Sequence, residues 1–594
     1  MRRFKRFIKR QNQPNTIGNR KRVGFLLIVF SILLFLVCAF RIAYVVVRGQ
    51  VAGVSLAERT EALYNGTETT FANRGQILDR NGNPLVVNSQ QFDMYAILSP
   101  DYKEGDQPLY LAQKDFSAAA EIISQHIDSK AEDIQALLEK GIKDDGEILF
   151  QVELGSGAKG LNLEQKTAIE QALAAKNISG IYFTAANNRS YVNGSFAAHL
   201  LGYTTNQDGK IIGSSGLEKT YEQVLAGTDG KIEFNKNAQG NPLPGTVKET
   251  QKVADGKDVT TTLSESLQMQ LEQLLDTADA SAQAESLTGV LMNAKTGDIL
   301  AMAQRPTFNP ETMEGTEDEN FVWRNLFTEE QYEPGSTIKV GTLATAIDAG
   351  VFNPNEVIQA GQIKVGDTTI NDHDFGQKGP LTMRQAFSWS SNVGMVNLYN
   401  KMGAAKWQEA MKQMGFGKTT NSGLDEAAGS LPTDNMVDLA MSAYGQAISV
   451  NQMQMLRLYS AIANKGVPVQ PHVVTDTKSE QSNEQMFSAE ASQQVLNYMR
   501  DVVEDQNYGT AYGLYNLKGQ AVSAKTGTAQ IPAEDGSGYG VGTSEYLYSV
   551  ALVYPTDEPQ YVLYLTMKRP QNYSADTLPN IANPLMAASM QLGE

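Results

Sequence analysis

The sequence has 594 residues, enough for about two to four domains, and its shares of hydrophobic (41%) and charged (19%) residues are those of an ordinary globular chain. The net charge of −17 gives no reason to expect a nucleic-acid-binding protein. The single cysteine, Cys38, excludes a disulfide within the chain, so the folded parts must be stable through their cores alone.

The N-terminus combines a basic cluster with an apolar run. Residues 1–22 contain nine Lys or Arg and no acidic residue, and residues 23–47 are apolar apart from Gly24, Ser31 and Arg41. About twenty apolar residues cross a bilayer, and basic residues before them predict a cytoplasmic N-terminus and an exported remainder. A cleaved signal peptide is the alternative, but the run is long for one and no clear cleavage site follows. We predict a cytoplasmic tail over 1–22 and a transmembrane anchor over 23–47.

Residues 48–258 are predicted to form one non-catalytic module. Short strand-like runs alternate with helical patterns, and residues 114–143 carry Ile and Leu at helical spacing, which predicts one buried helix face. Many glycines interrupt the module. We expect an irregular, elongated pedestal of mixed α/β structure.

A second domain is predicted over residues 259–594. The patterns indicate the following elements in chain order: strand 259–263, helix 264–276, a hairpin of strands 287–293 and 298–302, strands 549–554 and 561–566, and helix 579–592. The predicted fold is therefore α+β, an antiparallel sheet flanked by helices.

A short motif in this domain suggests chemistry. Ser336 and Lys339 are three residues apart, so on a helix they share a face and the amine can reach the hydroxyl. A serine is a poor nucleophile until a neighbour takes its proton. Pro334 and Gly335 place Ser336 at the start of the helix, where the helix dipole favours a developing alkoxide. S-x-x-K alone also arises by chance, so its meaning depends on further motifs.

Two further motifs follow, Ser390-Ser391-Asn392 and Lys525-Thr526-Gly527. Each alone fits an ordinary loop or strand end. S-x-x-K, S-x-N and K-T-G in this order, however, form the signature set of penicillin-binding proteins and serine β-lactamases. The set predicts acyl transfer by a serine without a histidine.

Each catalytic residue has a predicted role. Ser336 attacks a carbonyl, and Lys339, held neutral by cationic neighbours or by a dry site, accepts its proton. Ser390 relays the proton to the leaving amine, while Asn392 holds the substrate amide and positions Lys339. Lys525 keeps the local field positive, which lowers the pKa of Lys339 and attracts a substrate carboxylate.

Three neighbouring residues are predicted to bind substrate. Thr526 and Thr528 offer hydroxyl groups, and Gly527 allows a substrate strand to approach closely. The backbone N–H groups of Ser336 and Thr528 are predicted to form the oxyanion hole. We expect no metal and no other cofactor, because no histidine lies in a metal-binding spacing.

These motifs resemble those of class B penicillin-binding proteins, and the likeness extends over nearly the whole chain. Arg74 to Gly82, Arg189-Ser190-Tyr191 and Gly213 to Glu218 are similar to three boxes of the family's non-catalytic module, although Val192 replaces a usual proline. Gly445 to Val450 resembles a further box, with Ala447 in place of a usual glycine. The likeness is closest to the division-type penicillin-binding protein 2x group of Gram-positive cocci. That group carries C-terminal PASTA repeats, whereas this sequence stops at Glu594, near the expected end of the catalytic domain.

The resemblance implies a peptidoglycan D,D-transpeptidase. Its donor is a stem peptide ending in D-Ala-D-Ala, its acceptor is an amine on a neighbouring stem peptide, and β-lactams acylate it. It also implies a location at the division septum, a SEDS-family membrane glycosyltransferase and divisome proteins as partners, and a place for His373 beside the active-site cleft. Side-wall elongation, a β-lactamase, a β-lactam sensor and an inactive scaffold are the alternatives.

Overall fold

The computed structural model describes residues 16–48, 50–51, 54–55, 64–105, 107–143, 146–207, 209–236, 243, 245–374, 376–475, 484–531, 539 and 542–593. The chain folds into two compact units. One unit comprises Met1–Ala72 with Thr228–Ala254, and the other comprises Asn73–Gly227 with Asp255–Glu594. The predicted domain boundary at residues 258 and 259 stays a prediction.

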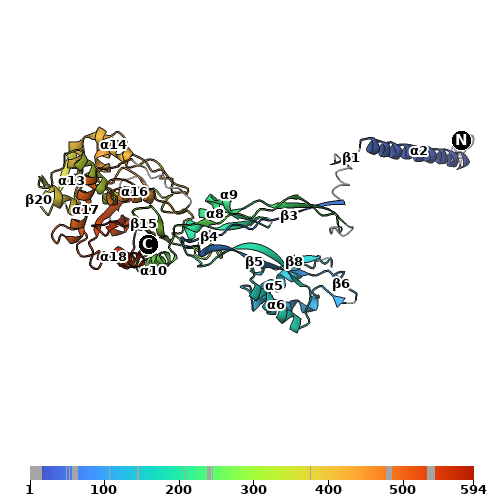
Figure 1. The fold of residues 1–594 in the computed structure, drawn as a ribbon. Helices are drawn as coiled ribbons and strands as arrows, with labels where there is room; N and C mark the ends of the chain where they lie inside the picture. The colour runs from blue at the N-terminus through green and yellow to red at the C-terminus, as the bar shows by residue number, and fades with distance from the viewer. Residues whose placement is uncertain are drawn as a thin grey trace, which may run out of the picture. The chain divides into compact units, whose positions relative to one another are not determined.

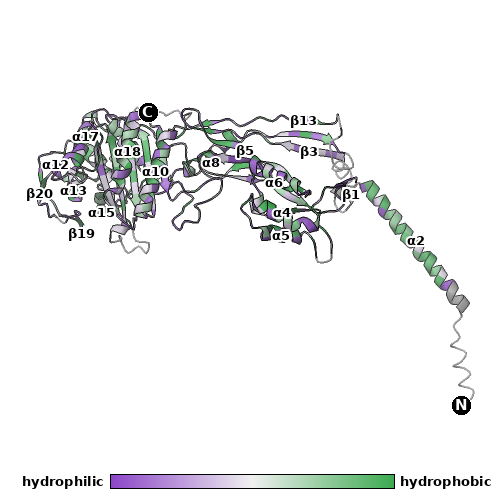
Figure 2. Ribbon diagram, turned by 90° about the horizontal axis from the view of Figure 1, so that it is seen from below, coloured by the Kyte–Doolittle hydropathy of each residue, from purple (hydrophilic) through white to green (hydrophobic). Residues whose placement is uncertain are grey.

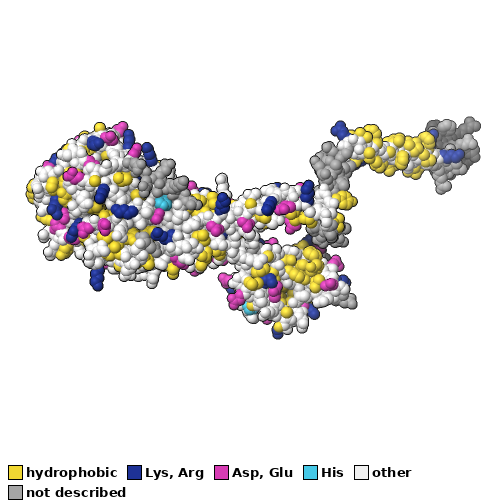
Figure 3. Space-filling model, in the orientation of Figure 1, with side chains coloured by type: hydrophobic (Ala, Val, Ile, Leu, Met, Phe, Trp, Pro, Cys, Tyr) yellow, Lys and Arg dark blue, Asp and Glu magenta, His cyan; other side chains and the backbone are white. Residues whose placement is uncertain are grey.

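The first unit begins with the apolar helix. Helix α2 (Thr16–Arg48) includes a candidate span, Lys21–Arg48, whose most apolar 18-residue window has a mean hydropathy of 3.0 and is not buried. Its residues are mostly hydrophobic (Figure 2), and hydrophobic side chains dominate the face of the helix seen in Figure 3. A helix of this length and composition fits a single-pass membrane anchor. The unit also holds a two-stranded ribbon, β1 (Gln50–Val51) and β2 (Val54–Ser55), and an antiparallel sheet in the order β13 (Lys248–Gln251), β12 (Gly230–Asn235) and β3 (Asn65–Thr70).

The second unit starts with a mixed sheet built on one long antiparallel pair of strands. Strand β5 (Pro84–Ile97) pairs with β9 (Ile181–Tyr191) along nearly its whole length. The sheet also contains β4 (Ile77–Leu78), β8 (Gln151–Glu153) and β14 (Val259–Thr260). Helices α4 (Phe116–Ser124), α5 (Ala131–Lys140) and α6 (Leu163–Ala175) bury their apolar faces in a small core of their own.

The single helix predicted over residues 114–143 is wrong, because the chain forms two helices there. Residues 125–130 make a turn in which the N–H of Ser129 donates to the carbonyl of Ile127, and Lys130 is extended with ψ of 144°. The break lets α4 and α5 fold against each other. The apolar spacing indicates helical structure correctly, but it does not reveal the turn between the two helices.

Short elements complete this half of the unit. They are β6 (Lys103–Glu104), β7 (Gln107–Pro108), α7 (Ala198–Leu201), β10 (Thr204–Gln207), β11 (Lys210–Gly213), α8 (Gly216–Thr220) and α9 (Glu222–Leu225).

Three boxes of the sequence meet in one buried ion cluster. Glu218 bridges two arginines, accepting from Arg74 Nε at 2.6 Å and from Arg189 Nε at 2.7 Å, and its side chain is fully buried. Arg189 also donates to Asn88 Oδ1 at 2.7 Å and to the carbonyl of Gly75 at 2.5 Å. A Cβ at Gly75 would lie 2.0 Å from a backbone carbonyl oxygen, so the close packing there requires glycine.

The catalytic half is a five-stranded antiparallel sheet flanked by helices (Figure 1). The strand order is β16 (Ile299–Arg305), β15 (Ser286–Asn293), β23 (Tyr561–Lys568), β22 (Tyr546–Tyr554) and β21 (Ser523–Gln530), so β21 is an edge strand. Helices α10 (Glu265–Ala282) and α18 (Thr577–Leu592) pack against each other and against the sheet. The predicted α+β fold is confirmed.

A group of further helices and ribbons completes the catalytic half. They are η3 (Gly335–Ile338), α11 (Lys339–Asp348), β17 (Val357–Gln359), β18 (Gln362–Val365), β19 (Thr368–Asn371), β20 (Pro380–Thr382), α12 (Met383–Ser388), α13 (Asn392–Met402), α14 (Ala404–Gln413), α15 (Met436–Ser442), α16 (Gln452–Ala463) and α17 (Ala489–Glu504). Helix α16 is buried almost along its whole length, which places the core of the domain between the sheet and the helices.

Candidate active site

Ser336 lies in a tight turn that leads directly into a helix. The 3₁₀ turn η3 holds Ser336, and α11 begins at Lys339. The serine thus precedes the first α-helical turn, slightly earlier than the sequence predicts. Gly335 has φ of +54°, and a Cβ there would lie 2.9 Å from the Cβ of Ala529. This glycine therefore lets the turn pack closely against the edge strand β21.

A second loop supports the same turn. Gly335 N–H donates to the carbonyl of Gly445 at 3.0 Å, and Ala447 N–H donates to Glu333 Oε1 at 2.9 Å. Ala447 has φ of +57°, a left-handed conformation that glycine adopts without strain. The structure thus gives a physical reason for the glycine that the resembling family has at this position.

The S-x-N motif spans the junction between α12 and α13. Ser390 has φ of +61°, which is rare for a residue with a side chain. Ser391 caps α13 by accepting from Gly394 N–H at 2.9 Å, and its hydroxyl contacts both carboxylate oxygens of Asp372 at 2.9 and 3.0 Å. Asn392, the first residue of α13, donates from Nδ2 to the carbonyl of Asn371 at 2.9 Å. Ser391, which caps the start of α13, therefore fixes the positions of its two neighbours, Ser390 and Asn392.

The three motifs meet at two lysines. Lys339 Nζ donates to the carbonyl of Ser390 at 2.6 Å and to Asn392 Oδ1 at 2.8 Å, and it lies 3.3 Å from Ser390 Oγ. Lys525 Nζ donates to the same Ser390 Oγ at 2.8 Å and to the carbonyl of Thr526 at 2.8 Å. The hydroxyl of Ser390 thus lies between the two amines, where it can pass a proton along.

Both lysines are completely buried, and burial changes their acidity. Burial lowers the pKa of Lys339 to about 7, against the opposing charge of Asp372. Burial also lowers the pKa of Lys525, and the nearby Lys339 lowers it further. The predicted direction for Lys339 agrees with this, and of the two expected causes, a dry site and the charge of Lys525, burial is the main one. Two ammonium groups so close to each other titrate as a pair.

Asp372 is the carboxylate whose charge acts on Lys339, and it is already bonded. Its oxygens accept from Ser391, from Val393 N–H at 3.0 Å and from Gly361 N–H at 2.9 Å, and its side chain is buried. Asp372 therefore anchors the start of α13. Neither lysine has an ion pair with it, and the lysines bond only neutral oxygens among the described residues.

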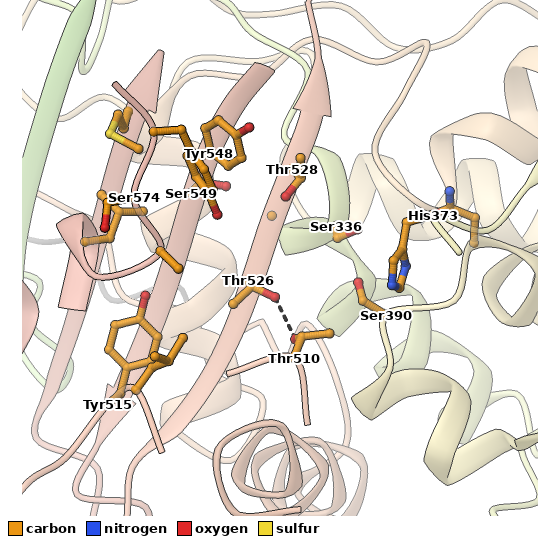
Figure 4. Close-up of a pocket in the computed structure, with 17 residues that line it drawn as sticks. Ser336, His373, Ser390, Thr510, Tyr515, Thr526, Thr528, Tyr548, Ser549 and Ser574 are labelled. Atoms are coloured by element: carbon orange, nitrogen blue, oxygen red, sulfur yellow. Dashed lines mark hydrogen bonds between the residues drawn. The ribbon is translucent and has the colours of Figure 1, made fainter. Parts of the chain in front are cut away.

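A cavity of about 410 Å³ opens above the lysines. Ser336 and Ser390 lie on one side of it, and Thr526 and Thr528 on strand β21 lie opposite (Figure 4). The lining residues are Ser336, His373, Ser390, Asn392, Thr510, Leu514, Tyr515, Thr526, Gly527, Thr528, Tyr548, Ser549, Met567, Tyr573, Ser574, Ala575 and Leu578. The structure thus brings every predicted site residue together, with Lys339 and Lys525 beneath the floor of the cavity.

His373 lines the cavity as predicted, and an aromatic neighbour positions it. Its ring centre lies 4.9 Å from that of Trp389. Burial lowers the pKa of His373; Asp374 opposes this effect and the two lysines add to it. A neutral imidazole at the rim can bond substrate but does not contact either lysine.

The sequence motifs do not reveal the far side of the cavity. Thr510 Oγ1 contacts Thr526 Oγ1 at 2.8 Å, and Tyr548 stacks on Tyr573 with ring centres 4.2 Å apart. Thr510, Tyr548 and Tyr573 belong to no motif and come from three separate segments. The one available signal was the period of β22, which places Tyr548 directly opposite Thr528.

Buried paired lysines, a serine in a tight turn and an edge strand define a serine acyl transferase of the penicillin-recognising type. Two family models agree: residues 287–587 match the penicillin-binding protein transpeptidase domain, and residues 69–261 match the penicillin-binding protein dimerisation domain. The chain belongs to the class B penicillin-binding proteins, and its catalytic half is a serine-type D-Ala-D-Ala transpeptidase domain.

Individual relatives show the extent of the likeness. The chain is 29% identical to penicillin-binding protein PbpB of Mycolicibacterium smegmatis, covering 87% of this chain and 82% of that protein. It is 27% identical to peptidoglycan D,D-transpeptidase FtsI of Escherichia coli, covering 84% of this chain and 79% of that protein. Among solved structures, penicillin-binding protein 2X of Streptococcus thermophilus is 35% identical, with a TM-score of 0.73 over 89% of this chain and 80% of that one.

Proposed function

We propose that this protein cross-links peptidoglycan stem peptides through an acyl-enzyme on Ser336 and that β-lactams inhibit it by acylating the same serine. One observation carries the proposal: Lys339 Nζ is buried, bonds Ser390 and Asn392, and lies one helical turn from Ser336 at the base of a cavity. The names of relatives, which include peptidoglycan D,D-transpeptidases, support it.

The acylation step uses Lys339 as the base. A neutral amine donates two hydrogens, which suit the carbonyl of Ser390 and Asn392 Oδ1, and its lone pair remains for the Ser336 proton. Ser336 Oγ attacks the penultimate D-Ala carbonyl while Lys339 takes its proton. The backbone N–H groups of Ser336 and Thr528 receive the developing oxyanion.

The leaving group then needs a proton. Ser390 Oγ lies 3.3 Å from Lys339 Nζ and accepts from Lys525 Nζ, so its own hydrogen can move to the leaving amine and be replaced from the lysine pair. Terminal D-Ala departs, its carboxylate held by Lys525, Thr526 and Thr528. An amine of a neighbouring stem peptide then attacks the acyl group.

The N-terminal helix and its flanking charges support a proposal for the location of the protein in the cell. The apolar helix α2 and the basic residues before it support a cytoplasmic N-terminus, a single span and an extracellular catalytic domain. The matched modules serve dimerisation and transpeptidation, so we propose that a SEDS-family membrane glycosyltransferase supplies the glycan strands. FtsI and 2X relatives favour a septal role with divisome proteins; side-wall elongation is the competing role.

The replacement Ser336→Ala tests the chemistry. We expect this variant to lose all covalent labelling by a fluorescent penicillin while its melting temperature stays unchanged, because only the attacking oxygen is removed. Ser574→Ala, which changes another serine lining the same cavity, is the matched control and should label normally. Persistent labelling of Ser336→Ala would place the nucleophile elsewhere.

Imaging tests the pathway. Fluorescent fusions of the full-length protein should accumulate at the division septum and lose that position when the divisome is blocked. A uniform signal along the side wall would instead support elongation.

A further inference from the structure

The active-site cavity has a second compartment on the far side of strand β21. Alternate side chains of a strand point to opposite faces. Gly527 faces η3, since a Cβ there would lie 3.0 Å from Thr337 Cγ2. Thr526 and Thr528 therefore point to the other face, which they share with Tyr548, the partner of Thr528 in β22. The hydroxyls of Thr526 and Thr528 thus lie between the catalytic residues and this second compartment (Figure 4).

The second compartment has one apolar wall and is firmly built. Leu514, Tyr515 and Leu578 form this wall, beside the hydroxyl groups of Thr510, Tyr548 and Ser574, and Tyr515 and Leu578 are only 4% and 7% exposed. Asn583 of α18 donates to the carbonyl of Leu514 at 3.0 Å and accepts from Asn516 N–H at 2.9 Å, which ties the loop to the helix. None of the described residues that line the cavity is acidic or carries a permanent positive charge.

The leaving residue of the proposed mechanism indicates which substrate would enter this compartment. The departing D-Ala carries the carboxylate, which in that mechanism is held near Lys525 and the Thr526–Thr510 hydroxyl pair. An incoming amine must approach the acyl carbonyl along the path by which the first amine left, because the two steps are the reverse of each other in geometry. The acceptor therefore enters from the Thr510 and Thr526 end, which leads into the second compartment.

We propose that Leu514, Tyr515 and Leu578 form the acceptor subsite, where they pack against the alkyl arm of an incoming primary amine. The proposal rests on the acyl-enzyme at Ser336 described above. An apolar wall without carboxylates favours the neutral, nucleophilic form of the amine over the ammonium ion. Burial raises the pKa of Tyr515, so its hydroxyl stays protonated beside the amine.

The transfer step balances in atoms and protons. The amine nitrogen forms a bond to the acyl carbon, and the bond from that carbon to Ser336 Oγ breaks. The amine loses one proton to the Ser390 and Lys339 relay, and Ser336 Oγ regains one proton from Lys339. No oxidant, reductant or cofactor takes part.

The test follows the fate of the acyl-enzyme. Full-length protein in detergent is given a thioester donor ending in an acyl-D-alanyl group, with Nα-acetyl-lysine as the acceptor, and the ratio of amide product to hydrolysis product is measured. Leu514→Trp should fill the compartment and lower this ratio about tenfold, the effect expected from losing a fitted apolar contact. Its acylation rate with fluorescent penicillin should stay unchanged. Tyr512→Trp, at an exposed neighbouring position outside the cavity lining, is the matched control.

Three results would overturn the proposal. The first is an unchanged product ratio in a folded Leu514→Trp variant. The second is an equal fall in penicillin acylation, which would assign the compartment to the donor. If Leu514→Trp fails to fold, Leu514→Ala decides: it must reduce transfer to Nα-acetyl-lysine more than transfer to D-alanine, and equal reductions are the third contradicting result. Because the ratio is measured on acyl-enzyme already formed, its failure is distinct from a failure of Ser336→Ala to abolish labelling.

Discussion

The pedestal and the active site each bury two cationic side chains, but they stabilise the charges in opposite ways. In the pedestal, Arg74 and Arg189 share the carboxylate of Glu218 at 2.6 and 2.7 Å. In the active site, Lys339 and Lys525 bond hydroxyl, amide and carbonyl oxygens, and no carboxylate of the described part of the chain is bonded to either. The carboxylate of Glu218 keeps both arginines charged, whereas the neutral surroundings of the two lysines disfavour their charged forms.

The choice of cation explains the difference. Burial lowers the pKa of Arg74, but the charges of Glu218 and Glu222 outweigh it and raise that pKa above its ordinary value. Arginine therefore remains charged, and the two arginines hold the three sequence boxes together through Glu218. Lysine loses its proton readily when it is buried without a counter-ion, so burial gives the active site a neutral amine that can act as a base.

Replacing Lys339 by Arg should have the largest effect, because it puts a permanently charged side chain in the place of the base. Arginine keeps a positive charge at this site but cannot accept the proton of Ser336. We expect both Lys339→Arg and Lys339→Ala to slow acylation by fluorescent penicillin about 10²- to 10⁴-fold, the usual contribution of a general base. Lys364→Ala, at an exposed position on β18, should react normally. Substantial activity in Lys339→Arg would mean that another group takes the proton.

Removing the carboxylate of Glu218 should have the largest effect on stability. Glu218→Ala leaves two buried arginines without their shared partner and should lower the free energy of unfolding by about 3–5 kcal/mol. Glu222→Ala, which removes the partly exposed second partner of Arg74, should cost about 1 kcal/mol or less. Denaturant unfolding of the purified protein in detergent measures both. An equal loss of unfolding free energy in the two variants would show that Glu218 does not hold the cluster together.

The pH dependence of acylation should reveal the active-site lysine. Lys339 must be neutral to accept a proton, and its pKa is lowered to about 7. The neutral fraction therefore rises with pH, so the acylation rate should increase about tenfold per pH unit below about pH 7 and then level off. Stopped-flow measurement of penicillin acylation checks this. A rate independent of pH over this range would contradict a lysine base.

The smallest effect should come from Asp372, whose charge raises the pKa of Lys339 against the effect of burial. Asp372→Asn removes that charge, so the pKa of Lys339 should fall further and the rising limb of the acylation profile should move to lower pH. Asp374→Asn, which alters a neighbouring carboxylate of the same loop, should leave the limb in place. A shift of the limb to higher pH in Asp372→Asn would reverse the assigned sign.

The sequence predicted the features that depend on residues close together in the chain. The hairpin strands, the two C-terminal strands and the closing helix all lie close to their predicted ranges, because apolar periodicity and turn residues determine them. Ser336, Asn392 and Lys525 could be found because short motifs carry the chemistry. Thr510, Tyr515 and Tyr573 could not, because the packing of α18 and its neighbouring loops brings them to the cavity from separate segments.

The extent of the Lys339 burial was hidden. The motifs indicate the lysine, the direction of its pKa change and two causes, a dry site and the charge of Lys525, but they do not show which cause dominates. Complete burial is a property of the folded site, and no pattern around residue 339 shows it.

The position of β21 at the edge of its sheet has a consequence for substrate recognition. An edge strand exposes unpaired backbone groups, and many proteins protect such edges because other chains can add to them. We expect an extended substrate peptide to add to the edge of β21 as a temporary sixth strand. Recognition through the backbone is largely independent of side chains, so the enzyme should tolerate variation in the residues preceding D-Ala-D-Ala.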